Sequence, residues 1–381
     1  MTKFLLYIGG FRLPDGTASA VRCIENAKIF EELGLTVVFI GKTIKNSEES
    51  KNLWNTICGY DCLNTEKAKK FPLEHFTSKY NISDIAGIIT YNYQINYLLP
   101  YFKIARNNNI PFISDNTEWY LREPGLGGLF RKFLTEYKMR VFNNKIKNHI
   151  CSTRYIQNYY PKCNTLVLPY VVDTTDLKWK TPTESQRNPL IKRFIYAGSP
   201  GNNMRKDALD LLIDAFLGVK HNQLFEFNIV GVTQDDFLDV FPTYKDILDK
   251  NINIHFHKRV SHIEVISMTK SSDFTVLLRP DTIQCRVGFS TKIVDSISCG
   301  VPVITNDINK DLTLYLKNGT QCIVVDNDVT SMTNALDSVI DMSFEQIEKM
   351  KRECLEYNPF DYKKFIPATK DFLIEAGILK N

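Results

Sequence analysis

No apolar run in this 381-residue sequence approaches the roughly 18–20 residues that a membrane-spanning helix needs. The amino-terminal run MTKFLLYIGGFR is too short for a signal peptide, and Phe4 to Ile8 within it is better explained as a first strand. A formal net charge of +4 is too small to indicate nucleic-acid binding by the whole chain. We therefore expect a cytoplasmic protein, with the inner face of the plasma membrane as an alternative location.

Disulfides, metal sites and a nicotinamide cofactor also lack support. The nine cysteines are scattered and odd in number, so we expect reduced and mostly buried thiols. Cys58 and Cys62 lie close together, but nothing nearby completes a set of metal ligands. The dinucleotide fingerprint G-x-G-x-x-G is missing, because the glycines after the first predicted strand have the wrong spacing. Neither a metal nor another cofactor is expected.

The length and the succession of strands and helices predict two α/β domains. A chain of this size suits two domains, each with its own core. Phe4 to Ile8, a helix from about Ser19 to Leu33 and a strand from Thr36 to Ile40 begin a doubly wound parallel sheet. The predicted division is a first α/β domain at 1–175, a linker at 176–190, a second α/β domain at 191–356 and a carboxyl-terminal helix at 357–381 that packs on the first domain.

Two points in the first half are candidates for ligand contact. Gly9 and Gly10 are expected in a loop directly after the first strand, where the backbone can approach a ligand closely. The alternative is a tight turn without a ligand. Asp115 and Glu118 follow another predicted strand, and carboxylates beside aromatic side chains suit a sugar. In the alternative, one of these acids caps the next helix and Trp119 packs beneath it.

The segment 119–150 is basic and also carries apolar residues at helical spacing. Seven basic side chains meet only two acidic ones, and the apolar positions are Phe130, Phe133, Leu134, Tyr137 and Val141. A helix of this kind can lie on an anionic membrane, which would give a peripheral contact through residues 126–147. More often such a helix packs its apolar face on the sheet and leaves its charges in water, and we favour that packing.

Two stretches of the second half combine glycine, cations and the start of a helix. After a predicted strand at Arg193 to Ala197, the chain continues through Gly198 and Ser199 to Arg205 and Lys206, which precede a clear helical pattern. Further on, a capping box at Ser261 predicts a helix start, and a later loop leads into a short helix with Asp295. Loops at the carboxyl ends of parallel strands bind ligands, and helix N-termini favour phosphate. A solvated charge pair at Arg205 and Lys206 is the alternative.

Several short motifs of this half together resemble a known family. They are Asp273-Phe274, Arg279, Gly288-Phe289-Ser290-Thr291-Lys292, Asp295 and Cys299-Gly300-Val301-Pro302-Val303-Ile304. They resemble the donor-site signature of family-four glycosyltransferases with the GT-B fold, and more narrowly enzymes of bacterial capsule and surface-polysaccharide clusters. The resemblance implies two Rossmann-like domains with parallel sheets facing across a cleft. It also implies metal-independent, retaining transfer of a sugar from a nucleotide-diphosphate sugar to an acceptor such as a lipid-linked saccharide.

The resemblance assigns roles to individual residues. Lys206, with Arg205 beside it, matches the basic residue that holds the donor diphosphate, and Asp295 matches the second acid of an E-x7-E motif that binds the ribose hydroxyls. Asp115 and Glu118 match an acidic segment on the acceptor side and complete the implied catalytic set. The other implied donor contacts are Gly9, Gly10, Gly198, Ser199, Arg279, Gly288, Phe289, Ser290, Thr291 and Lys292.

One position departs from the family pattern. Val287 stands where the first acid of E-x7-E normally contacts the donor sugar, so the identity of the sugar is left open. Two other functions are compatible with the same two-domain architecture. A nucleotide-sugar epimerase would release free sugar without an acceptor, and a non-catalytic partner subunit would bind nucleotide without turnover.

Overall fold

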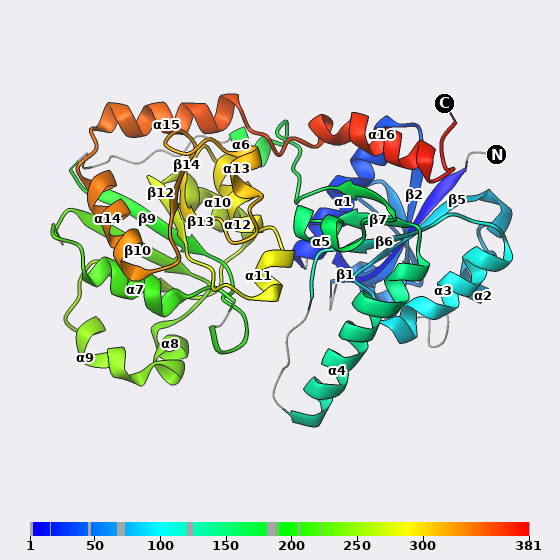
Figure 1. The fold of residues 1–381 in the computed structure, drawn as a ribbon, viewed down its shortest axis with the longest axis horizontal. Helices are drawn as coiled ribbons and strands as arrows, with labels where there is room; N and C mark the ends of the chain where they lie inside the picture. Colours follow the sequence, from blue (N-terminus) through cyan, green and yellow to red (C-terminus); the bar gives the residue numbers. More distant parts are fainter. Residues whose placement is uncertain are drawn as a thin grey trace. The chain divides into compact units, whose positions relative to one another are not determined.

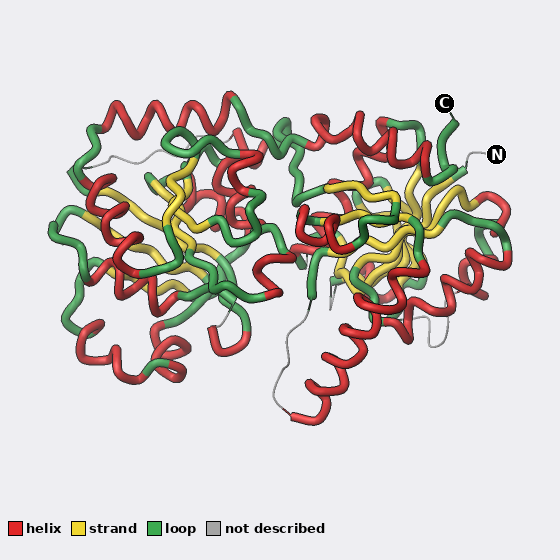
Figure 2. The backbone as a smooth tube through the Cα atoms, viewed as in Figure 1, coloured by secondary structure: helices red, strands yellow, loops and turns green. Residues whose placement is uncertain are grey.

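The computed structural model describes residues 3–15, 17–44, 47–66, 73–119, 125–180, 188, 190–204, 206–221 and 223–380. The chain divides into two compact units. Unit 1 consists of Met1–Asp173, Val287–Phe289 and Asp361–Asn381, and unit 2 of Thr174–Arg286 and Ser290–Phe360. Each unit contains one sheet with helices packed on both of its faces (Figures 1 and 2). Within the predicted linker, residues 181–187 and 189 lie outside the described part.

An eight-stranded sheet forms the centre of unit 1, in the order β3-β4-β2-β1-β5-β6-β7-β8. Its strands are β1 (Phe4–Leu13), β2 (Thr36–Thr43), β3 (Trp54–Ile57), β4 (Tyr60–Asn64), β5 (Ile85–Tyr91), β6 (Phe112–Asn116), β7 (Asn148–Cys151) and β8 (Asn164–Val167). All neighbours are parallel except β3 with β4. The chain extends the sheet from β1 to β2 on one side and then to β5 on the other, so the strand order reverses beside β1.

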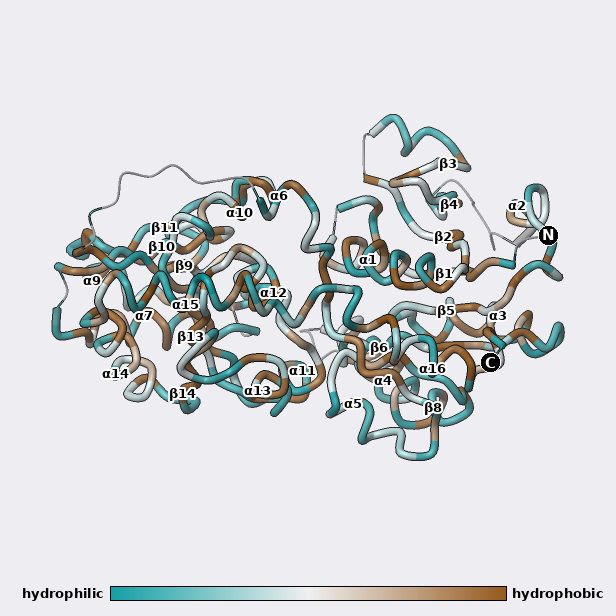
Figure 3. The backbone as a smooth tube through the Cα atoms, turned by 90° about the horizontal axis from the view of Figure 1, so that it is seen from above, coloured by the Kyte–Doolittle hydropathy of each residue, from teal (hydrophilic) through white to brown (hydrophobic). Residues whose placement is uncertain are grey.

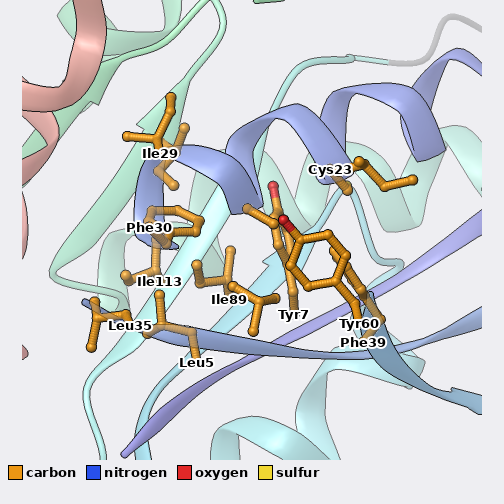
Figure 4. Packing of buried hydrophobic residues seen from close by; sticks show 14 of the residues in the cluster. Leu5, Tyr7, Cys23, Ile29, Phe30, Leu35, Phe39, Tyr60, Ile89 and Ile113 are labelled. Atoms are coloured by element: carbon orange, nitrogen blue, oxygen red, sulfur yellow. The ribbon is translucent and has the colours of Figure 1, made fainter. Parts of the chain in front are cut away.

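The helices of unit 1 cover two apolar clusters, one on each face of the sheet. They are α1 (Ala18–Glu32), α2 (Leu73–Thr77), α3 (Ile95–Asn107), α4 (Gly125–Tyr137), α5 (Arg154–Tyr159) and α16 (Ile366–Glu375), with short turns η1 (Glu48–Lys51), η2 (Ile82–Asp84), η3 (Lys138–Phe142), η4 (Asn143–Lys145) and η7 (Tyr362–Phe365). Because side chains alternate along a strand, Leu5 and Tyr7 join the cluster beneath α1 and α16, whereas Leu6 and Ile8 join the opposite one. Figure 4 shows the first cluster under α1.

The sheet of unit 2 is parallel throughout, in the order β11-β10-β9-β12-β13-β14. Its strands are β9 (Lys192–Ala197), β10 (Phe225–Val230), β11 (Ile254–His257), β12 (Phe274–Leu277), β13 (Val303–Asn306) and β14 (Cys322–Val325). The helices are α6 (Leu177–Lys180), α7 (Leu209–Leu217), α8 (Gln234–Val240), α9 (Lys245–Leu248), α10 (His262–Lys270), α11 (Ile283–Val287), α12 (Thr291–Ser298), α13 (Leu312–Tyr315), α14 (Val329–Ile340) and α15 (Phe344–Glu356), with turns η5 (Asn202–Met204) and η6 (Pro242–Tyr244).

Local sequence signals account for several of these elements. The capping box predicted at Ser261 is confirmed, since its hydroxyl accepts from the Glu264 N–H and the Glu264 carboxylate accepts from the Ser261 N–H at 2.8 Å. A similar box at Ser343 starts α15. Figure 3 shows hydrophilic and hydrophobic residues alternating along α15, as expected for a helix that buries one face.

The predicted loop at Gly9 and Gly10 is wrong, because both residues lie inside β1. Gly9 pairs with Tyr91 of β5, and after a shift in register the strand pairs again with β2 at Arg12. A Cβ atom at Gly9 would stand 2.6 Å from the ring of Phe11. The missing side chain therefore makes room for this buried ring and lets the strand continue.

The favoured packing of the basic helix on the sheet is also wrong. The large apolar side chains of α4 are exposed, with exposed fractions of 88% for Leu126 and 63% for both Phe130 and Phe133. The buried residues of α4 are instead Gly128 and Thr135. The helix therefore lies against its own unit through Gly128, Thr135 and the half-buried Leu134, and turns its other large apolar side chains outward.

Candidate functional site

The candidate site of unit 2 lies where the strand order of the sheet reverses. The chain leaves β9 to build β10 and β11 on one side, and returns to build β12 on the other side of β9. Ligands of open α/β sheets bind outside the carboxyl ends of the strands at such a point. Gly198 and Ser199 directly follow β9, and Arg279 closely follows β12. The fold thus brings together residues that lie about 80 positions apart.

A buried carboxylate organises the cations at this point. Asp207 is 1% exposed and accepts hydrogen bonds at 2.8 Å from both Lys292 Nζ and the Tyr196 hydroxyl. Arg279 Nε lies 3.7 Å from the other carboxylate oxygen. Burial alone would raise the pKa of Asp207, but the nearby charges of Lys292 and Arg279 hold this pKa below its ordinary value. Asp207 is therefore ionised and joins two of the predicted donor-binding residues.

Asp207 was not predicted as a site residue. The signal that could have identified it is its position immediately after Arg205 and Lys206, in a loop that follows a strand. An acid beside two cations looks like a surface ion pair when only the sequence is known. Only the fold shows that its partners are Lys292 and Arg279.

Lys206 is held by a tightly folded loop. Its backbone N–H donates to the Pro200 carbonyl at 2.8 Å, and its own carbonyl accepts a hydrogen bond from the thiol of Cys285 at 3.3 Å. Gly201 has φ +81°, and a Cβ atom there would stand 2.9 Å from Cβ of Lys206. The loop therefore folds back over Lys206, whose side chain is half-buried. Arg205 lies outside the described residues.

Replacing Gly198 by alanine is expected to destabilise unit 2 and to disturb Lys292. Gly198 has φ +140°, and a Cβ atom there would stand 2.5 Å from Cε of Lys292. Strained backbone of this kind costs about 1–3 kcal/mol. Urea unfolding should show that loss for Gly198→Ala and none for Gly127→Ala, where the added Cβ meets open space. Equal stability of the Gly198 variant and the native chain would contradict this geometry.

Asp295 presents a carboxylate oxygen that is ready to accept hydrogen bonds. It lies in α12, and its Oδ2 is 3.7 Å from Nε2 of His262, the first residue of α10. Its Oδ1 is buried and has no hydrogen-bond partner among the described residues. Ser290 precedes α12 and makes no side-chain capping bond, and Thr291 is the first residue of the helix. His262 was not predicted, since a histidine beside a capping serine gives no signal of a site.

The remaining donor residues of the motif are not grouped with this cluster. Contacts group Val287–Phe289, and therefore Gly288 and Phe289, with unit 1. Val287, at the position of the missing acid, is fully buried. The described donor-side candidates of unit 2 are therefore Gly198, Ser199, Lys206, Arg279, Ser290, Thr291, Lys292 and Asp295.

The acid predicted at the acceptor side is a buried structural centre of unit 1. Asp115 lies inside β6 with no exposed surface and bonds to the hydroxyl of Tyr7. Arg22 of α1 lies 3.3 Å from it and also donates to the carbonyls of Leu168 and Pro169. Burial, and to a smaller extent the negative charge of Asp115, raise the pKa of Tyr7. The Tyr7 hydroxyl therefore stays protonated. Asp115 thus joins side chains of β1 and α1 in the interior of unit 1.

The residues near Asp115 include a packed tryptophan and two charged side chains, Glu118 and Lys138. Trp119 is buried, donates Nε1–H to Glu136 at 2.9 Å and meets Tyr159 edge-on, so it packs as the alternative interpretation predicted. Glu118 is half-buried. Lys138, a buried residue that the sequence did not single out, has its pKa lowered to about 8 by burial, although nearby Asp115 and Glu118 oppose this shift.

The described residues contain neither a candidate metal site nor a helix that could span a membrane. No group of three or more histidine, cysteine or acidic side chains in this part of the chain could hold a metal ion. No helix built from these residues is both long and apolar enough to cross a membrane. The nine cysteines all lie in the described part, and none of them forms a disulfide.

Comparisons with known proteins agree with this geometry. Residues 191–342 match the family model described as glycosyl transferases group 1. No curated protein matches the chain. Among solved structures, sucrose-phosphate synthase from Thermosynechococcus elongatus is 11% identical with a TM-score of 0.69, and the match covers 98% of each chain. HepE from Anabaena, in complex with UDP and glucose, is 13% identical with a TM-score of 0.65, over 98% of this chain and 100% of that one.

A glycosyltransferase from Rickettsia africae is also similar, at 14% identity and a TM-score of 0.66 over the full length of both chains. At such low identity these likenesses show the fold alone. The predicted fold class is confirmed, because the chain has two parallel α/β sheets and the GT-B fold of its structural neighbours.

Proposed function

We propose that this chain is a retaining glycosyltransferase that builds a lipid-linked saccharide of a bacterial capsule or surface polysaccharide, because its residues 191–342 match the family model described as glycosyl transferases group 1. The donor is a nucleotide-diphosphate sugar and the acceptor is a hydroxyl group. The reaction takes place on the cytoplasmic side of the membrane. UDP is the first nucleotide to test, since UDP occupies the similar structure of HepE.

The observation that carries the proposal is the cluster of cations at the carboxyl ends of β9 and β12. Lys292 and Arg279 lie at Asp207, and Lys206 immediately precedes Asp207 in the chain, so these residues carry three positive charges and one negative charge. The two positive charges in excess match the roughly two negative charges of a nucleotide-sugar diphosphate. Asp207 holds Lys292 and Arg279 in place before the donor binds, which lowers the cost of arranging them around the ligand.

The same cluster suits the departure of the diphosphate. The bond between the sugar C1 and the phosphate oxygen breaks, and the new bond between C1 and the acceptor oxygen forms on the same face of the sugar. The acceptor proton passes to an oxygen of the leaving diphosphate. Negative charge grows on that diphosphate in the transition state, where fixed cations stabilise it most. Asp295 accepts hydrogen bonds from the ribose hydroxyls through its partly exposed carboxylate.

Replacing Asp295 by alanine is expected to raise the KM for the donor by roughly 10–100-fold. A hydrogen bond to a charged group contributes about 1.5–3 kcal/mol, and the variant loses such bonds to ribose. Nucleotide release with a panel of nucleotide sugars and lipid-linked acceptors measures the effect. Asp326→Ala, which removes an exposed acid of unit 2, serves as the control.

Three results would point elsewhere. Release of free sugar without any acceptor would indicate an epimerase. Nucleotide binding with turnover only after addition of a second chain would indicate a partner subunit. If no nucleotide sugar on the panel binds at all, the proposed donor site is wrong.

A further inference from the structure

The arm formed by α4 and η3 carries an unusual concentration of exposed apolar side chains. The described residues include 18 exposed large hydrophobic side chains, and six of them lie within residues 126–141. These six are Leu126, Leu129, Phe130, Phe133, Tyr137 and Val141. Figure 1 shows the amino-terminal half of α4 extending beyond the rest of unit 1. The exposed residues therefore form one patch and are not scattered over the surface.

The apolar residues of α4 share a single face of the helix. At 3.6 residues per turn, the five from Leu126 to Tyr137 fall within a sector of roughly 100°. Gly128 and Thr135, the buried residues of this helix, lie on the opposite side. A helix that belonged to the core would bury its phenylalanines, so this one presents a face that unit 1 does not cover.

The charges around the apolar face are almost all positive. Arg131 and Lys132 are exposed on either side of it, and Arg140, Lys145 and Lys147 are exposed towards the end of the arm. Glu136 is the single acidic residue between 125 and 147, and it already bonds to Arg140 and Trp119. An apolar face between basic side chains complements the surface of an anionic bilayer, which offers acyl chains beneath a layer of phosphates.

We propose that the arm binds anionic membranes, with Phe130 and Phe133 inserted beneath the headgroups and Arg131 and Lys132 at the lipid phosphates. A second copy of the chain fits the face less well. Two such arms packed through their apolar faces would bring the same basic residues close together, and like charges repel. Membrane binding stands independently of the proposed donor, and it would bring the enzyme to a lipid-linked acceptor.

The full-length chain should sediment with vesicles that contain phosphatidylglycerol, and much less with phosphatidylcholine vesicles. Combining Phe130→Ser and Phe133→Ser should weaken vesicle binding at least about tenfold, since each exposed ring loses its burial in lipid. Combining Arg131→Gln and Lys132→Gln should weaken binding to the anionic vesicles by roughly tenfold and abolish most of its dependence on salt. Circular dichroism should show an unchanged fold, because all four side chains are exposed.

Control variants at other exposed sites distinguish binding by the arm from nonspecific adsorption of the protein to vesicles. Ile252→Ser with Ile263→Ser removes two apolar side chains that are at least as exposed as the phenylalanines, and Lys349→Gln with Arg352→Gln removes two exposed cations of α15. Neither pair should change vesicle binding. The proposal is overturned if the native chain ignores anionic vesicles, or if the control pairs weaken binding as much as the arm variants. It is also overturned if Phe130→Ser with Phe133→Ser only dissociates a dimer. Nucleotide release without lipid tests the donor proposal separately.

Discussion

Replacing Lys206 by alanine is expected to lower kcat/KM at least about 100-fold. The variant removes a cation that would contact the diphosphate most strongly as the bond to the sugar breaks, and such contacts are worth roughly 10²–10³ in rate. Lys206 is also fixed by its loop, with its N–H on the Pro200 carbonyl and Gly201 packed against its Cβ. Nucleotide release under single-turnover conditions measures the loss.

Two further variants separate charge from structure at this position. Lys206→Arg keeps the positive charge and should recover part of the activity, because a guanidinium can also bind phosphate. Lys250→Ala removes an exposed lysine of the same unit and should leave turnover unchanged. Activity of Lys206→Ala within about twofold of the native value would mean that the diphosphate lies elsewhere.

Replacing Asp207 by asparagine is expected to destabilise unit 2 by about 3–5 kcal/mol, because removing one partner of a buried ion pair leaves the other charges uncompensated. The side chains of Lys292 and Arg279 are only 13% and 7% exposed, so water would solvate them poorly. Chemical unfolding of the variant gives the loss directly. Combining Asp207→Asn with Lys292→Met removes a cation together with the carboxylate and should cost less than Asp207→Asn alone.

The dependence on pH gives an independent test of the same cluster. Because the pKa of Asp207 is lowered in the folded chain, its contribution to stability is present above the ordinary pKa of about 3.9. That contribution is lost as the pH falls through the lowered pKa. The stability difference between the native chain and Asp207→Asn should therefore be constant near neutral pH and shrink in strong acid. A difference that grows on acidification would contradict the assignment.

Short-range signals predicted the elements of the fold well. The capping box at Ser261 and the apolar strands Phe274 to Leu278 and Val301 to Thr305 carry their own local causes, and the structure has α10, β12 and β13 there. Glycine was a less reliable signal of a turn. Gly9 and Gly10 suggest a turn by composition, yet Gly9 stays in β1 because a ring two residues away needs the space above it. That cause is a tertiary contact, which periodicity does not contain.

The same limit applies to the charged residues. Asp115 and Asp207 are both acids at or after strands, and the sequence placed only Asp115 among the reacting groups. Both are buried, and what distinguishes them is their partners: Asp115 is enclosed with Arg22 and Tyr7, whereas Asp207 joins Lys292 and Arg279. For α4, the spacing of Phe130 and Phe133 predicted an amphipathic helix correctly. It could not say which face the fold would turn outward.

The most direct test of the account is a crystal structure of the chain with UDP bound. We predict density for the diphosphate against Lys206, in contact with Lys292 and Arg279, and for the ribose against the carboxylate of Asp295. Density for the nucleotide at any other place, with the cluster around Asp207 left unoccupied, would contradict the claim that this cluster holds the donor.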